Sequence, residues 1–116
     1  MLARLAPDDE LLAAYAGGDD SAFETLYKRY RRRLWGLAKK MAWDYQQAED
    51  ILVEAMSAVA VQARRGAIQG SFIGYSLTAV HHRGLHVLER RNERNARSAV
   101  QLKVSLVADT PNPEQS

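Results

Sequence analysis

The segment QQAEDILVEAM, residues 46–56, combines a regularly spaced apolar face with an ordered set of acidic residues. Apolar residues such as Ile51 and Leu52 recur at the three- and four-residue steps of one helix face. Asp50 and Glu54 lie four residues apart, so they share a second face that flanks the apolar one. The segment contains no basic residue to pair with them, and like charges at this spacing repel. We therefore expect a helix with one buried face and one acidic face.

Two explanations fit such an acidic face. Exposed acids often serve only solubility, whereas carboxylates that meet Arg or Lys of a partner form charge-assisted hydrogen bonds. The segment has no histidine, no serine nucleophile and no glycine-rich phosphate loop beside the acids. It therefore predicts a docking surface or a solvated surface, and the protein is not expected to be an enzyme.

The composition sets the class of protein. A chain of 116 residues builds one domain with one core, and an apolar content of 47% argues against wholesale disorder. The chain has no cysteine, which excludes disulfides and thiolate chemistry. The apolar runs are far shorter than a membrane span, and the opening MLARLAP is too short for a secretory signal. We expect a cytoplasmic protein with no membrane span.

Charge is segregated along the chain, although the net charge is only +2. Residues 8–24 contain six acids and no base, and residues 28–40 contain seven bases and no acid. A second basic stretch over residues 83–97 contains five arginines. Such clusters produce local electrostatic fields that the net charge of the chain does not reveal. A solvated helix face and a nucleic-acid contact both explain them.

The periodicity is helical throughout and predicts an all-α fold, a compact bundle of about four helices with a flexible C-terminal tail. The expected helices cover residues 9–16, 22–41, 45–64 and 72–94. The expected capping residues are Asp8, Ser21 in a capping box with Glu24, Asp44 and Ser71. Residues 98–116 carry two prolines and no sustained apolar face, so we expect a linker or disordered tail after a domain at residues 1–97.

The same periodicity predicts the core. The expected core residues are Phe23, Leu26, Tyr27, Tyr30, Leu34, Leu37, Ala38, Met41, Ala48, Ile51, Leu52, Ala55, Met56, Val59, Leu77, Val80, Leu85 and Leu88. Trp35 is expected at the edge of this set.

Residues 8–97 resemble the second conserved domain of bacterial RNA polymerase sigma factors of the extracytoplasmic-function (ECF) class. The matching motifs are DELL at residues 9–12, GD..AFE.LY.RY at residues 18–30 and AED...E at residues 48–54. The resemblance implies a transcription initiation module that docks on core RNA polymerase and opens the promoter minus-ten element, with no cofactor. A complete factor of this class carries a second, helix-turn-helix domain. The chain is therefore either part of such a factor or a one-domain protein.

In the family the AED...E helix docks on the clamp helices, a coiled coil of the largest polymerase subunit. The resemblance therefore implies polymerase-binding roles for Asp50 and Glu54. The position between them, Val53, belongs to the same site, but the family usually has Gln there. One polar contact with the polymerase is expected to be absent in this chain.

The segment after the AED...E helix occupies the place of the promoter-reading helix, which captures unstacked bases of single-stranded minus-ten DNA. The implied DNA-binding residues are Phe72, Tyr75, His81, His82, Arg83, His86, Arg90, Arg91 and Arg94. Aromatic rings suit stacking on bases and arginines suit contacts to phosphates. Core packing for Phe72 and a solvated surface for the arginines remain the alternatives.

The chain departs from the family at His81 and His82, where an Arg-Asn pair is usual. His82 and His86 have the i, i+4 spacing of a metal pair, but no third ligand is evident. These departures favour an alternative function, a sigma-like decoy that binds polymerase or an anti-sigma factor without reading DNA. An anti-sigma factor is thus a further candidate partner.

Overall fold

The structure is a computed structural model, which describes the backbone of residues 6–109 and the side chains of residues 6–98. Four α-helices follow one another along the chain: α1 (Asp8–Ala16), α2 (Asp20–Met41), α3 (Tyr45–Arg64) and α4 (Phe72–Asp109). The all-α prediction is confirmed. Within the described residues, no helix combines the length and the apolar character that a bilayer-spanning segment needs.

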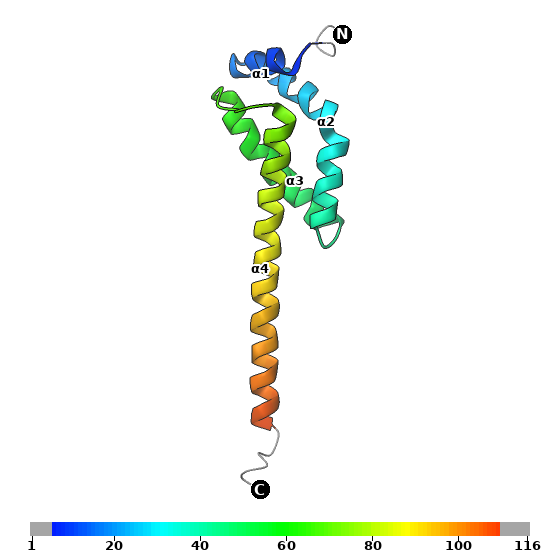
Figure 1. Cartoon of the computed structure of the whole chain (residues 1–116), viewed down its shortest axis with the longest axis vertical. Helices are drawn as coiled ribbons and strands as arrows, with labels where there is room; N and C mark the ends of the chain where they lie inside the picture. The colour runs from blue at the N-terminus through cyan, green and yellow to red at the C-terminus, as the bar shows by residue number, and fades with distance from the viewer. Residues whose placement is uncertain (1–5, 110–116) are drawn as a thin grey trace. The chain divides into compact units, whose positions relative to one another are not determined.

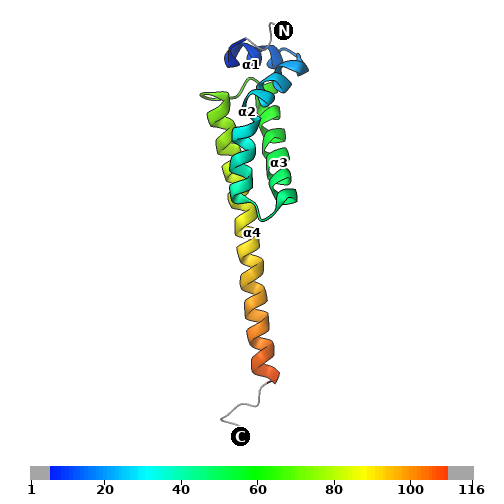
Figure 2. The same cartoon turned by 90° about the vertical axis from the view of Figure 1, so that its right-hand side faces the viewer.

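The chain divides into two compact units, Met1–Leu85 and His86–Ser116. In the first unit, α2, α3 and the N-terminal turns of α4 lie alongside one another, and α1 lies across one end of them (Figures 1 and 2). The fourth helix was expected to end near residue 94, but it continues to Asp109, because residues 95–109 contain neither glycine nor proline. The predicted division at residue 98 stays a prediction, and residues 110–116 of the predicted tail lie outside the described residues.

Two of the four capping predictions are correct. The Asp44 carboxylate accepts a hydrogen bond from the Gln47 amide at 2.8 Å and opens α3. At the start of α4, Ser71 Oγ accepts a hydrogen bond from the Gly74 amide at 3.0 Å. Both caps satisfy amide groups that have no partner within the helix.

The other two capping predictions are wrong. Asp19 caps α2, and its carboxylate accepts hydrogen bonds from both the amide and the hydroxyl of Ser21, so Ser21 is inside the helix. At α1 the N-cap residue is Pro7, and Asp8 is the first helical residue. Its carboxylate is engaged by side chains of α2 instead of by amides of α1.

The core lies where α2, α3 and the start of α4 face one another. Every core residue predicted for α3 is buried, as are Leu26, Leu34 and Ala38 of α2. The prediction of Leu85 is wrong, because the buried residues of α4 step by four through Ser76, Val80 and Gly84, and Leu85 points about 100° away from them. Leu88, which is also exposed, belongs to the second unit.

The partly exposed residues of the predicted α2 stripe are Phe23, Tyr27, Tyr30, Leu37 and Met41, with Trp35 at the edge as expected; Leu77 of α4 is also partly exposed.

Helices α2 and α4 approach closely at Gly84. A methyl group at this glycine would lie 2.6 Å from Met41 Sδ and 2.9 Å from Met41 Cβ. These distances are far below ordinary van der Waals contact, so the absence of a side chain permits the crossing. The crossing fixes the part of α4 that carries the predicted DNA-binding residues of the first unit.

Candidate binding surfaces

The acidic face of α3 is exposed, as predicted. Asp50 Oδ1 accepts a hydrogen bond from Gln46 Nε2 of the same helix at 3.0 Å. Glu54 forms an ion pair with Arg83 of α4, and the two side chains are 51% and 34% exposed. Glu54 therefore has a basic partner within the chain, although the segment 46–56 supplies none. Its partner lies on another helix, where local sequence spacing gives no signal.

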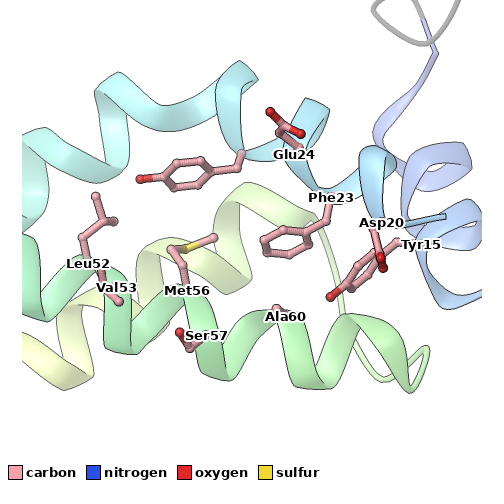
Figure 3. Close-up of a pocket in the computed structure, with 10 residues that line it drawn as sticks. Tyr15, Asp20, Phe23, Glu24, Leu52, Val53, Met56, Ser57 and Ala60 are labelled. Atoms are coloured by element: carbon pink, nitrogen blue, oxygen red, sulfur yellow. The ribbon is translucent and has the colours of Figure 1, made fainter. Parts of the chain in front are cut away.

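Beside the acids, Val53 is 57% exposed and ends an apolar groove between α2 and α3. The groove has a volume of about 490 Å³ (Figure 3). Its walls are formed by Tyr15, Asp20, Phe23, Glu24, Tyr27, Leu52, Val53, Met56, Ser57 and Ala60. A second groove shares Tyr27, Leu52 and Val53 with the first. The second groove also contains Arg31, Arg32 and Glu49, so an apolar groove and a more polar one adjoin each other beside the acidic face of α3.

One end of the groove is held by Arg64 of α3. Its guanidinium lies 4.0 Å from the centroid of the Tyr15 ring and forms an ion pair with Asp20. The hydrogen bond with Asp20 raises the pKa of Arg64 above its ordinary value. The Tyr15 ring in turn packs against Phe23 at a centroid distance of 4.9 Å. Sequence analysis placed Arg64 only in the last turn of its helix and missed this cluster.

A second cluster fastens α1 to the basic stretch of α2. Arg29 Nη1 lies 2.7 Å from Asp8 Oδ1, and the Tyr30 hydroxyl donates a hydrogen bond to the other carboxylate oxygen of Asp8. That hydrogen bond, together with burial, raises the pKa of Tyr30. One of the seven bases of α2 is thus used in structure rather than offered to a partner.

The predicted DNA-binding aromatics differ in accessibility. Phe72 is fully buried, and its ring packs against Phe23 and Tyr30 at centroid distances of 5.8 and 6.0 Å. The alternative of core packing is therefore correct for Phe72, because a ring sealed in the core offers no face to a base. Tyr75 is partly exposed, so part of its side chain is accessible to a ligand.

The histidines and arginines of α4 lie mainly on its surface. His81 and His82 are exposed, with ring centroids 6.4 Å apart, and Arg83 is held by Glu54. In the second unit, the exposed candidates are His86, Arg90 and Arg94, and Arg91 is partly exposed. In the described part of the chain, no group of three His, Asp or Glu side chains is arranged to hold a metal ion.

Comparison with known proteins places part of the chain in a described family. The Sigma-70 region 2 family matches residues 26–94. The ECF RNA polymerase sigma factor SigM of Mycobacterium tuberculosis strain H37Rv is 43% identical over 65 residues, which are 56% of this chain and 30% of that protein. SigM of the Erdman strain is 43% identical over 63 residues, 54% of this chain and 29% of that protein.

The chain thus spans about 30% of the length of the curated relatives it matches. No solved structure matches it. The family match includes α2 from residue 26 onward, all of α3 and α4 as far as residue 94. Because it covers more than half of the sequence and both candidate surfaces, the chain belongs to the Sigma-70 region 2 family.

Proposed function

We propose that this chain is the region 2 module of an ECF-class sigma factor, which docks on core RNA polymerase and holds single-stranded minus-ten promoter DNA during initiation. The observation that carries the proposal is the family match over residues 26–94, which includes the acidic helix α3 and the basic part of α4. The module supplies binding surfaces and no catalysis, and it needs no cofactor.

For docking, Asp50, Val53 and Glu54 contact the clamp helices of the largest polymerase subunit. All three side chains are exposed on α3, which supports this role. The two carboxylates receive Arg or Lys side chains of the polymerase. Val53, where relatives usually have Gln, contributes an apolar contact in place of a hydrogen bond.

For DNA, the exposed residues of α4 contact the strand. Arg90, Arg91 and Arg94 hold phosphates and Tyr75 offers a ring edge or face to a base. The other proposed contacts are His81, His82, Arg83 and His86. Phe72 acts from inside the core, where it anchors the first turn of α4.

A second candidate function is a sigma-like decoy that binds polymerase or an anti-sigma factor without reading DNA. The replacement of the family's usual Arg-Asn pair by His81 and His82 favours it. A neutral imidazole offers one donor and one acceptor, whereas arginine offers five donors and a fixed charge.

The docking role is tested by pull-down of core polymerase with Asp50→Lys. We expect polymerase binding to fall sharply while the melting temperature hardly changes, because an exposed acid contributes little to folding. Asp9→Lys is the matched control, since it makes the same charge change at an exposed site on α1. Equal binding by the two variants would contradict docking through α3.

The DNA role is tested by titration with minus-ten and scrambled single-stranded oligonucleotides at several salt concentrations. Affinity is expected to fall with salt by about 0.7 in log–log slope per phosphate contact. Discrimination between the two sequences is expected to be weak, because His81 and His82 stand where the family has an Arg-Asn pair. Polymerase binding without any DNA binding would select the decoy.

A further inference from the structure

The Glu54–Arg83 ion pair joins two residues to which the proposed function gives different partners. Glu54 belongs to the acidic face of α3 that is proposed to dock on polymerase, and Arg83 belongs to the DNA-binding side of α4. Both residues lie in the first compact unit of the chain. In the free protein, the carboxylate of Glu54 and the guanidinium of Arg83 therefore pair with each other.

The geometry of the pair favours exchange. The printed contact joins Nη2 of Arg83 to Oε2 of Glu54, so both charged groups meet at the ends of their side chains. Arg83 Nε is buried and has no hydrogen-bond acceptor among the described residues. With side-chain exposures of 34% and 51%, the pair is screened by solvent and contributes little to folding. A stronger partner can displace either side at low cost.

We propose that this ion pair masks both contact residues in the free chain and couples the two binding events. When a basic residue of the polymerase engages Glu54, Arg83 is released and its guanidinium becomes available to a DNA phosphate. Because coupling between two binding sites is reciprocal, DNA that engages Arg83 also releases Glu54 for the polymerase. The inference rests on the proposed function and adds to it a device that favours DNA binding by the polymerase-bound form.

The first test measures affinity of the full chain for a single-stranded minus-ten oligonucleotide as a function of salt. Glu54→Gln is expected to raise the affinity about two- to fivefold, the range of a single exposed ion pair. It should also steepen the log–log salt slope by about 0.7, because one further phosphate contact forms.

The control for lost negative charge is Glu49→Gln, an exposed acid on the same helix that makes no ion pair with Arg83 in the structure. Its effect measures the general gain from removing one negative charge. Glu54→Gln should exceed this control, and the excess should vanish in the Glu54→Gln/Arg83→Gln double variant. Such a cycle isolates the coupling between the two side chains.

The second test measures the affinity for core polymerase in the absence of DNA, which reports the release of Glu54. Arg83→Gln is expected to raise affinity for core polymerase about two- to fivefold, because Glu54 is released. Arg65→Gln, an exposed arginine at the end of α3, is the control for lost positive charge. This test decides the proposal if Glu54→Gln lowers the melting temperature enough to complicate the first test.

The outcomes separate the device from the proposed function. If wild-type chain binds both DNA and polymerase, but Glu54→Gln matches Glu49→Gln and Arg83→Gln matches Arg65→Gln, the pair is only a link between α3 and α4 and masking is refuted. If wild type and every variant bind neither partner, the proposed function fails and the coupling fails with it.

Discussion

Replacing Gly84 by alanine tests the closest helix crossing in the first unit. The new methyl group would meet Met41 Sδ at 2.6 Å, Met41 Cε at 2.8 Å and Met41 Cβ at 2.9 Å. The sulfur and the terminal methyl can move by rotation of the Met41 side chain. Met41 Cβ is fixed to the α2 backbone, so the helices themselves must separate.

The expected magnitude follows from two opposing terms. Overpacking of this kind costs about 1–3 kcal/mol, whereas replacing a helical glycine by alanine contributes about 1 kcal/mol of helix propensity. Gly36 is the matched control, because it lies within α2 and a methyl group there meets nothing within 4 Å. Gly36→Ala should raise the free energy of unfolding by about 1 kcal/mol. Gly84→Ala should fall below that variant by about 1–3 kcal/mol.

The assay is urea and thermal denaturation of both variants, followed by circular dichroism. A difference of 1 kcal/mol shifts the melting temperature of a domain of this size by about 4–8 °C, which is readily measured. Met41→Ala should recover only the part of the loss that comes from Sδ and Cε, because alanine keeps the Cβ atom that lies 2.9 Å from the new methyl group. If Gly84→Ala is stabilised as much as Gly36→Ala, the close approach of α2 and α4 does not exist.

Three further predictions concern the core and the contact between α1 and α2. Ser76→Ala should raise the free energy of unfolding by up to about 1 kcal/mol in urea denaturation, because Ser76 Oγ is buried with no hydrogen-bond partner among the described residues; a loss of stability would indicate a missed partner. Leu52→Ala should lower the free energy of unfolding by about 2–5 kcal/mol. Val53→Ala, at the exposed neighbouring position, should change it by less than about 0.5 kcal/mol. Similar losses for both variants would contradict the assigned core face. The pKa of Tyr30 is raised above its ordinary value of 10.0, so its contribution to stability is present below that pH and is lost as the pH rises through the folded-state pKa. Denaturation midpoints between about pH 9 and pH 11 should therefore fall less steeply for Tyr30→Phe than for wild type, and identical slopes would show that the hydrogen bond to Asp8 is absent.

The sequence by itself determined where the four helices begin, to within about two residues, and the predicted core of α3, but not where α4 ends. Capping and apolar periodicity act within a few residues, so the Asp44 cap and the buried face through Ile51 and Leu52 were readable from local spacing. The acidic face that flanks this core was equally readable from local spacing. The motifs at residues 18–30 and 48–54 identified the family for the same reason, since they are short and contiguous.

Capping at the first two helices could not be read with the same certainty, because several polar residues compete there. Asp19 and Ser21 are both polar residues near the start of α2, and either could cap it. In the structure Asp19 is the cap, and its carboxylate accepts hydrogen bonds from the amide and the hydroxyl of Ser21. At α1, the Asp8 carboxylate is bound by Arg29 and Tyr30, which lie 21 and 22 residues later. The choice between capping and a tertiary contact depends on where α2 passes.

Only the tertiary structure decided which charges and rings meet across helices. Glu54 meets Arg83 because α3 and α4 lie close together, and Arg64 reaches Asp20, 44 residues away, at the end of the groove. Phe72 packs in the core against Phe23 and Tyr30, so its place at the start of the promoter-reading segment did not reveal its burial. Sequence periodicity specifies which face of each helix is apolar. Which helix packs against that face depends on how closely the helices approach each other. Close packing at sites such as Gly84 sets that distance.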